Sequence, residues 1–307
     1  LPAPEPRDDR NWAIVRPRLA GICGTDIAAI TGTVSPSASP FSSFPAVLGH
    51  EVVGTLASAG RAIDLPPGTR VVVDPSISCT LRELDPCPAC AAGWPYLCRH
   101  VAEGALAPGM IVGFCRDLPG GWAEQMLAHR DQLFAVPESV GDERAVLVEP
   151  LSIGAHAVLR RPPRPGERIL ILGAGTIGLC LLAALRLLGF TGLDVTITAK
   201  HPAQARLAQA LGSDRVASPA QAFSAAEELG ARRYRPLLGR PVFRGGFDLV
   251  YDCVGSQRTL DDALRLTREG GTVVVVGGAG EVGTIDWTFV WMRELNVLGA
   301  AGYGLET

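Results

Sequence analysis

A stretch of closely spaced glycines between two apolar segments constrains the fold of this 307-residue chain more than any other feature. Residues 168–172 (Arg-Ile-Leu-Ile-Leu) are typical of a buried strand, and the apolar run up to Leu188 favours a helix. Arg186 interrupts that run, so we expect a strand and a helix rather than a membrane span. The glycine spacing permits the tight turn and close backbone approach that a dinucleotide pyrophosphate requires at a helix N-terminus. The predicted cofactor contacts are Gly173, Gly175, Thr176, Ile177 and Gly178.

Strand and helix patterns continue to alternate after this segment. The expected strands are residues 195–199, 247–252 and 272–276, and the expected helices include 204–211 and 259–267. Such alternation implies parallel pairing, so this half predicts an α/β, doubly wound parallel sheet. Asp252-Cys-Val-Gly255 and Gly277-Gly278 follow strand ends, at the edge where these sheets bind ligands.

The end of the second strand in this half bears on the choice of dinucleotide. NAD-specific sites place an acid there, which hydrogen-bonds the ribose 2′-hydroxyl and repels a 2′-phosphate. This chain has Lys200-His201 at that point, and Asp194 lies at the opposite end of the strand. An ammonium and an imidazole suit a phosphate, so we expect NADP(H) to be favoured over NAD(H). The alternative is that both side chains face solvent and the site accepts either cofactor.

The first half of the chain has a different character. It is dense in glycine and proline, with short β-rich runs that predict an irregular all-β domain. Within it, Cys23-Gly-Thr25-Asp26 is followed by Gly49-His50-Glu51. A thiolate, an imidazole and a carboxylate form a ligand set that zinc accepts in a catalytic site with an exchangeable position. Either segment alone is weak evidence, because a single Cys or His is usually structural.

The eight cysteines indicate the redox environment. Four lie within twenty residues (Cys79, Cys87, Cys90 and Cys98), and the others are scattered through apolar stretches. A disulfide framework is unusual in a chain with 47% hydrophobic residues that can build its own core, so metal thiolates are favoured. This reasoning predicts a reducing compartment, the cytoplasm.

Together these segments resemble the zinc-dependent medium-chain alcohol dehydrogenase family, in particular its threonine, sorbitol and glucose dehydrogenase-like branch. The resemblance runs from about Trp12 to Gly304 and implies a GroES-like irregular β domain followed by a Rossmann domain. It implies Cys23 and His50 as ligands of a catalytic zinc, with Glu51 as a ligand or close partner. Val148-Glu149-Pro150-Leu151 resembles the family segment whose carboxylate binds this zinc directly or through water. The resemblance also implies that Asp26 orients His50, that Thr25 contacts the substrate oxygen, and that Val254, Gly255 and Gly277 line the nicotinamide.

The four-cysteine cluster resembles the structural-zinc lobe of the family, with one departure. The spacing of Cys87, Cys90 and Cys98 fits the last three ligands, but seven residues separate Cys79 from Cys87 instead of two. We interpret this as a lengthened loop that returns the same thiolate to a four-thiolate zinc site. The alternative is a lobe of free thiols that has lost its metal.

The resemblance implies domain bounds of 1–148 (GroES-like, with the structural-zinc lobe), 149–290 (Rossmann) and 291–307 (the start of a return to the first domain). Family members continue beyond such a point, so the sequence is expected to be truncated at both ends. Where relatives carry a His five positions after the Cys, this chain has Ala28, which leaves the proton route open. A homo-oligomer, a dimer or tetramer, is expected for the full-length protein.

The remaining histidines and one basic stretch receive structural interpretations. His100, His129 and His156 lack partners at metal-ligand spacing and are expected to be structural or solvent-facing. Residues 232–244 are rich in arginine and lengthen a connection of the second half; a solvated loop is favoured over an anion site.

The sequence as a whole predicts a zinc-dependent oxidoreductase (EC 1.1.1.-). It would transfer a hydride between a small-molecule alcohol, of the polyol, sugar or amino-alcohol type, and NAD(P)+. A formal net charge of -3 gives no basic field for nucleic acid or an anionic membrane, so neither partner is expected. Two alternatives are a zinc-free quinone or enoyl reductase of the same fold and a truncated, non-catalytic zinc- and dinucleotide-binding protein.

Overall fold

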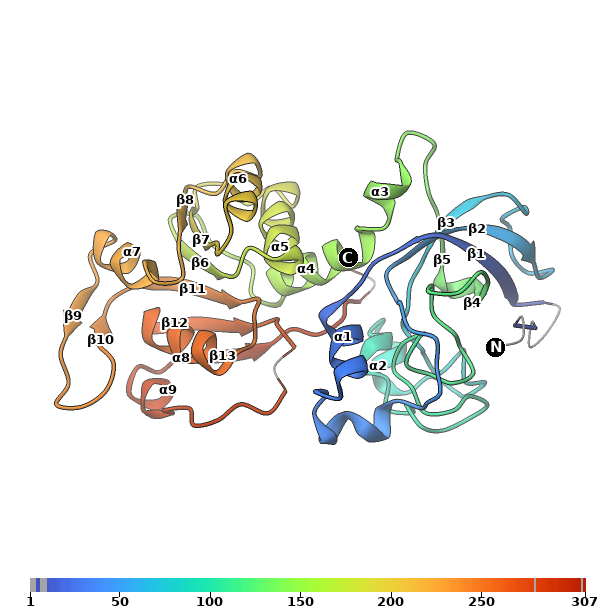
Figure 1. Ribbon diagram of the computed structural model, residues 1–307, viewed down its shortest axis with the longest axis horizontal. Helices are drawn as coiled ribbons and strands as arrows, with labels where there is room; N and C mark the ends of the chain where they lie inside the picture. Colours follow the sequence, from blue (N-terminus) through green and yellow to red (C-terminus); the bar gives the residue numbers. More distant parts are fainter. Residues whose placement is uncertain (1–3, 6–9, 279, 305) are drawn as a thin grey trace. The chain divides into compact units, whose positions relative to one another are not determined.

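The computed structural model describes residues 4–5, 10–278, 280–304 and 306–307. The chain forms two compact units (Figure 1), with residues 150–302 in the second and the remainder in the first. The first unit therefore contains both the N-terminal part of the chain and the segment Tyr303–Thr307.

The first unit is built on a five-stranded antiparallel sheet. Its order is β4-β1-β2-β3-β5, with β1 Trp12–Ala20, β2 Val52–Ala59, β3 Arg70–Val73, β4 Met126–His129 and β5 Leu133–Ala135. The short helices of this unit are α1 Gly24–Thr31, α2 Pro88–Ala91 and α3 Asp142–Ala145, with 3-10 turns η1 Pro36–Phe41, η2 Pro95–Leu97 and η3 Arg130–Gln132. Buried side chains such as Val15, Leu56, Val71 and Met126 form its core. Much of the unit is loop, and the loops carry the candidate metal ligands.

The second unit contains a six-stranded parallel sheet of order β13-β12-β11-β6-β7-β8. Its strands are β6 Arg168–Leu172, β7 Asp194–Thr198, β8 Arg215–Ala217, β11 Phe247–Asp252, β12 Thr267–Val275 and β13 Asn296–Gly299. Strands β7 and β8 lie on one side of β6, and β11, β12 and β13 lie on the other. The strand order therefore reverses between β6 and β11. Ligands of doubly wound sheets bind at this reversal.

Helices cover both faces of this sheet, as Figure 1 shows within the second unit. They are α4 Val148–Arg160, α5 Thr176–Leu187, α6 Pro202–Ala210, α7 Ala222–Glu228, α8 Gln257–Leu266 and α9 Thr288–Met292. Alternate residues of β6 belong to two cores: Ile169 and Ile171 pack with α5, whereas Leu170 and Leu172 pack with α8. This two-sided burial explains the uninterrupted apolar pattern of the strand.

The arginine-rich stretch before β11 forms a hairpin of β9 Arg232–Tyr234 and β10 Val242–Arg244. Several of its arginines are ion-paired, Arg233 with Glu227, Arg240 with Asp261 and Asp262, and Arg244 with Glu269. The hairpin is therefore largely neutralised by neighbouring acids. Among the described residues, no helix has the length and apolar character needed to cross a membrane.

Candidate active site

Cys23, His50 and Glu51 converge at one end of the first unit. Cys23 is the N-cap of α1, and His50 and Glu51 directly precede β2. The ligand atoms of these three side chains all lie within 4.8 Å of one another. Gly21 makes room for the carboxylate, since a β-carbon there would lie 1.8 Å from Oε2 of Glu51.

Asp26 connects the two sequence segments of this cluster. Its buried carboxylate accepts hydrogen bonds from the backbone N–H of Cys23 (2.9 Å) and of Gly49 (3.3 Å). The same carboxylate lies 3.4 Å from Nδ1 of His50. A carboxylate against Nδ1 holds the proton on that nitrogen and leaves the Nε2 lone pair for a metal. Asp26 thus has the position of a residue that orients a metal-binding imidazole.

The electrostatics of the cluster suit a cation. Burial acts to lower the pKa of His50, but Asp26 and Cys23 outweigh it and raise the pKa to about 10. Burial raises the pKa of Glu51. A thiol, an imidazole and a buried carboxyl group in contact, with the imidazole already oriented, form a donor set that fits zinc.

Thr25 and Glu149 lie beside this cluster. Oγ1 of Thr25 is 3.6 Å from Sγ of Cys23, and its side chain is exposed. Glu149 is outside the group of three converging ligand atoms among the described residues. Burial raises the pKa of Glu149 to about 7, and the charge of His50 opposes this rise. Glu149 is thus electrostatically coupled to the cluster, as an additional carboxylate at its margin.

The sulfurs of the four clustered cysteines also converge. The Sγ atoms of Cys79, Cys87, Cys90 and Cys98 all lie within 4.8 Å of one another. Sγ of Cys79 is 3.5 Å from Sγ of Cys98 and accepts a hydrogen bond from the backbone N–H of Cys87 at 3.3 Å. The lengthened loop therefore returns Cys79 to the other three sulfurs.

Backbone N–H groups favour ionisation of one of these thiols, Cys87, whereas burial raises the pKa of Cys90 to about 11 and also raises that of Cys98. Burial acts against the charge of Cys87, but backbone N–H groups, first that of Arg99 and then that of Cys90, lower its pKa to about 6. The Arg99 N–H lies 3.5 Å from the Cys87 sulfur. Such N–H donors stabilise thiolates, which are the form that binds metal. Four convergent thiols with these donors fit a closed tetrahedral zinc site.

The glycine-rich turn in the second unit is shaped by close packing. Gly173 has a φ of 99°, and its N–H donates to Oγ1 of Thr198 at 2.8 Å. A β-carbon at Gly178 would lie 1.8 Å from the carbonyl oxygen of Gly173, which holds the start of α5 against the turn. By contrast, a β-carbon at Gly175, the N-cap of α5, would meet no protein atom within 4 Å. The protein leaves open space where a pyrophosphate would approach.

The loops after β11 and β12 meet this turn. Oδ1 of Asp252 accepts hydrogen bonds from the backbone N–H groups of Val254 and Gly255, both at 3.0 Å. A β-carbon at Gly277 would lie 2.5 Å from the carbonyl carbon of Val254, and one at Gly173 would lie 2.5 Å from its side chain. The predicted nicotinamide-binding residues are therefore packed together at the carboxyl edge of the sheet.

Lys200 and His201 follow β7, and both are exposed. His201 is the N-cap of α6, and the backbone N–H groups of both residues donate to Oε1 of Gln204 at 3.2 Å. The side-chain nitrogens are not used by these contacts. The turn thus fixes the backbone and leaves two basic side chains at the end of the strand.

Comparisons with known proteins identify the family. The sequence profile of the alcohol dehydrogenase GroES-like domain matches residues 9–138, and that of zinc-binding dehydrogenases matches residues 176–307. A sorbitol dehydrogenase of Arabidopsis thaliana is 30% identical over 306 residues, which cover 99% of this chain and 76% of that protein. The L-galactonate-5-dehydrogenase of Escherichia coli is 33% identical over 269 residues, or 87% and 69% of the two chains. The chain belongs to the zinc-dependent medium-chain alcohol dehydrogenase family.

The structure of a zinc-binding dehydrogenase from Sinorhizobium meliloti 1021 bound to NADP agrees with this assignment. It is 33% identical, has a TM-score of 0.77, and the match covers 99% of this chain and 80% of that one. This medium-chain dehydrogenase is therefore an oxidoreductase that acts on alcohols. The predicted family, the GroES-like plus Rossmann α/β fold and the predicted enzyme class are confirmed.

Sequence reasoning missed several groups near the candidate metal ligands of the dehydrogenase. The hydroxyl of Tyr303 donates to Oδ1 of Asp74 at 3.1 Å, and burial raises the pKa of both side chains. The charges of Asp74 and Glu149 each contribute to the shift at Tyr303. Nδ1 of His100 lies 3.3 Å from Sγ of Cys79. No spacing rule links these residues, because each contact joins loops far apart in sequence.

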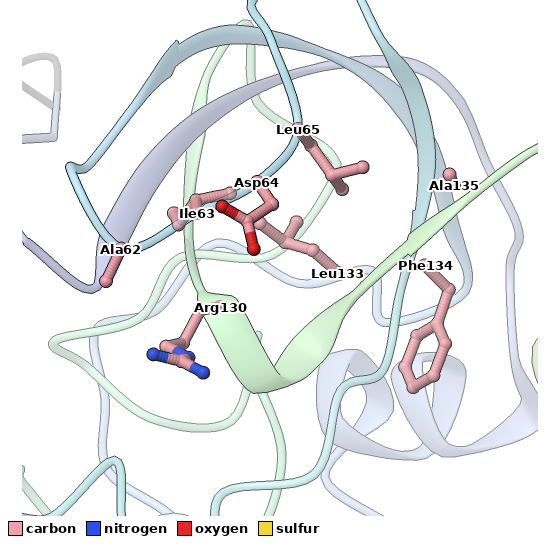
Figure 2. Close-up of a pocket in the computed structure, with 8 residues that line it drawn as sticks. All are labelled: Ala62, Ile63, Asp64, Leu65, Arg130, Leu133, Phe134 and Ala135. Atoms are coloured by element: carbon pink, nitrogen blue, oxygen red, sulfur yellow. The ribbon is translucent and has the colours of Figure 1, made fainter.

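One hollow of about 380 Å³ on the first unit lies apart from this chemistry. Figure 2 shows Asp64, Arg130, Leu133 and Phe134 among the side chains that line it. None of the predicted ligands or cofactor contacts borders it. It is an open, mixed surface beside β5, and it takes no part in the candidate active site.

Proposed function

We propose that this dehydrogenase oxidises a secondary alcohol of a polyhydroxylated substrate with NADP+, using a zinc ion held by Cys23, His50 and a carboxylate. The observation that carries the proposal is the convergence of three donor types within 4.8 Å, with Asp26 against the outer nitrogen of the imidazole. A zinc-free reductase of the same fold has no need of this donor set. The proposed carboxylate is Glu51, with Glu149 as the group that exchanges with it or acts through water.

The reaction separates a hydride from a proton. Zinc, when bound, lowers the pKa of a substrate hydroxyl toward neutrality. The nicotinamide, when bound, accepts the hydrogen of the carbinol carbon together with its electron pair. The hydroxyl proton must leave before the hydride is transferred, and we assign Thr25 Oγ1, beside Cys23, as its first acceptor. The hydroxyl of Thr25 passes on its own proton as it accepts that of the substrate.

A carboxyl group is the proposed next carrier of that proton. Ala28 cannot perform this role, whereas the pKa of Glu149 is raised to about 7, close to the value at which a group both gains and releases protons near neutral pH. Glu51, buried at 8% exposure, has a pKa raised in the same direction. The neighbourhood of two such carboxyls supports a route through acids in place of a histidine.

The substrate class is inferred from the relatives. Their names include sorbitol dehydrogenase, L-galactonate-5-dehydrogenase and L-threonine 3-dehydrogenase, which act on a polyol, a sugar acid and an amino-alcohol. We therefore expect oxidation of alcohols within these three classes and no reduction of quinones or enoyl substrates. A screen of polyols, sugars and amino-alcohols, each with NAD+ and NADP+ and with zinc analysis of the same sample, tests the proposal. Turnover by protein that contains no zinc would contradict it.

We propose NADP(H) as the preferred cofactor because Lys200 and His201 occupy the end of β7, where an NAD site requires an acid. A 2′-phosphate there would meet an ammonium group and an imidazole. The relative from Sinorhizobium meliloti was crystallised with NADP. We expect kcat/KM to be higher with NADP+ than with NAD+. In the Lys200→Ala variant the ratio of these two values should fall by about tenfold, which corresponds to about 1.4 kcal/mol.

Lys200 is also the only lysine of the chain, which permits a direct binding test. Within these 307 residues, an amine-reactive reagent labels this side chain and otherwise only the terminal amine. NADP+ should protect Lys200 from labelling at concentrations where NAD+ does not, as measured by mass spectrometry of the peptide. Equal protection of Lys200 by both cofactors, or a higher kcat/KM of the wild type with NAD+, would contradict the proposed preference for NADP(H).

Further, we propose a homo-oligomer, a dimer or tetramer, for the full-length protein and a cytoplasmic location. Strand β13 ends its sheet and exposes Val297, and Trp287 and Trp291 of the adjoining α9 segment are 60% and 72% exposed. Such apolar groups beside an open sheet edge support association. The eight cysteines are free thiols, which suits a reducing compartment. Light scattering of the Trp291→Glu variant against wild type tests the first point.

A further inference from the structure

The loop that lengthens the four-cysteine site carries a buried arginine. The backbone N–H groups of Arg82 and Leu84 both donate to the carbonyl oxygen of Cys79, and Glu83 has a φ of 59° in the left-handed region. This tight turn follows directly after the displaced ligand. The side chain of Arg82 is 0% exposed; Arg82 and Arg293 are the two largest fully buried side chains among the described residues.

Backbone carbonyl groups surround this guanidinium. Its terminal nitrogens donate to five carbonyl oxygens of the segment 101–109, at 2.6 to 3.4 Å: those of Val101, Glu103, Leu106, Ala107 and Gly109. No carboxylate of the part of the chain that the structure describes forms an ion pair with Arg82. Carbonyl dipoles satisfy hydrogen bonds but carry no net charge. A fully buried cation needs a compensating negative charge, which must come from elsewhere.

The neighbouring sulfurs can supply this charge. Four thiolates around one divalent zinc leave an excess of about two negative charges in a closed site. Burial lowers the pKa of the Arg82 guanidinium, and the charges of Cys115, Cys98 and Cys79 oppose this shift more strongly than that of Glu103. Of these three cysteines, Cys79 and Cys98 belong to the four-thiol cluster.

A second basic group faces the displaced ligand. Nδ1 of His100 lies 3.3 Å from Sγ of Cys79, and its Nε2 lies 3.7 Å from a carboxylate oxygen of Glu103. With a proton on Nδ1, His100 is a hydrogen-bond donor to a thiolate at Cys79. Arg82, through the turn that follows Cys79, and His100, through its ring nitrogen, thus place two basic side chains next to the displaced ligand.

We propose that Arg82 is the buried counter-cation of the four-cysteine metal site, so that zinc binding and the folding of segment 101–109 are coupled through one side chain. The loop that displaces Cys79 from the family spacing thus also contributes the charge that stabilises the displaced site. This inference rests on a structural zinc at the four cysteines, which their convergent sulfurs fit. It identifies Arg82 as a residue that acts on the metal through charge and not as a ligand.

The test compares zinc retention in three variants of the full chain. Arg82→Met removes the charge, Arg82→Lys keeps it but loses most of the carbonyl hydrogen bonds, and Arg144→Met removes an exposed arginine of the same unit, outside the cysteine cluster, as a control. We expect Arg82→Met to weaken retention of the structural zinc against a chelator by about tenfold or more. Arg82→Lys should stay within about threefold of wild type although its Tm falls, and Arg144→Met should be unchanged. The cobalt-substituted proteins report the same site through their thiolate charge-transfer band.

Each result of this comparison supports or contradicts the charge role of Arg82. Equal zinc loss from Arg82→Lys and Arg82→Met would mean that Arg82 is only a scaffold for carbonyl groups, and unchanged retention in Arg82→Met would exclude the charge effect. If Arg82→Met does not fold, Arg82→Lys decides, because tenfold weaker retention in a charged variant contradicts the proposal. Wild-type protein with no second zinc would overturn the metal site and this inference together. Wild-type protein with two zinc ions and an unaffected Arg82→Met variant would overturn the inference alone.

Discussion

Asp26 sets the orientation and the pKa of His50 in the candidate catalytic cluster. Its carboxylate lies against Nδ1 of His50, and the resulting attraction holds a proton on the imidazole until about pH 10 in the metal-free protein. The folded-state pKa is raised above 6.5, so the charged imidazole contributes its full stability below pH 6.5 and loses it as the pH rises through about 10. Zinc requires the neutral imidazole and must displace this proton.

We therefore predict that zinc affinity of the catalytic site rises with pH across the neutral range and that Asp26→Asn flattens the rise. Without the carboxylate the pKa of His50 falls toward 6.5, so between pH 7 and 9 the slope of log Kd against pH should decrease by about one. Chelator-competition titrations at several pH values measure the slope. Asp64→Asn, an exposed acid of the same unit, serves as control. Equal slopes in wild type and Asp26→Asn would rule out the proposed coupling.

Residues that belong to a local motif could be assigned from the sequence, and residues placed only by tertiary folding could not. Cys23, His50 and Glu51 stand in short turns whose residue types indicate a metal, and the structure brings their ligand atoms together. Arg82 resembles any surface arginine in the sequence, because its burial depends on a loop twenty residues further along the chain. His100 was expected to be structural or solvent-facing, and its contact with Cys79 follows only from the return of the lengthened loop.

At the scale of elements, the strand–turn–helix at β6 and α5 was the most predictable part of the molecule. Glycine placement there reflects two separate requirements, since Gly178 packs on the Gly173 carbonyl while Gly175 faces open space. The strand before Lys200 was expected at 195–199 and lies at Asp194–Thr198, one residue earlier. The β9–β10 hairpin was expected only as a long loop, because its three-residue strands are too short to show a periodicity.

Two glycine-to-alanine substitutions should separate these requirements. In Gly178→Ala the new β-carbon would lie 1.8 Å from a backbone oxygen, so overpacking should cost about 1–3 kcal/mol and lower the Tm by roughly 4–10 °C. Gly175→Ala meets no protein atom and should change the free energy of unfolding by less than about 1 kcal/mol. It should instead weaken NADP+ binding by about tenfold, because the pyrophosphate approaches that backbone. Calorimetry and cofactor titration check the pair; a fully stable Gly178→Ala protein would contradict the packing argument.

At the scale of the whole molecule, the chain separates its tasks between two units. Both clusters of candidate metal ligands lie in the first unit, and the glycine-rich turn lies in the second. The domain bounds expected from the sequence, 1–148 and 149–290, stay predictions. The two compact units of the structure divide between Glu149 and Pro150. The separation has a physical consequence: loss of one metal need not disturb the fold that holds the dinucleotide.

Serine substitution at one cysteine of each metal cluster should therefore produce different losses. Cys23→Ser should reduce the zinc content from two ions to one and kcat by more than about 100-fold, while Kd for NADP+ and the Tm stay near the wild-type values. Cys90→Ser should act first on stability, because a structural zinc contributes folding free energy directly; a fall in Tm of more than about 10 °C is expected. Elemental analysis, calorimetry and steady-state kinetics on both variants, with Cys180→Ser as a control outside the clusters, separate the two roles. Full turnover by Cys23→Ser, or an unchanged Tm for Cys90→Ser together with two zinc ions, would show that the sites do not divide catalysis and stability in this way.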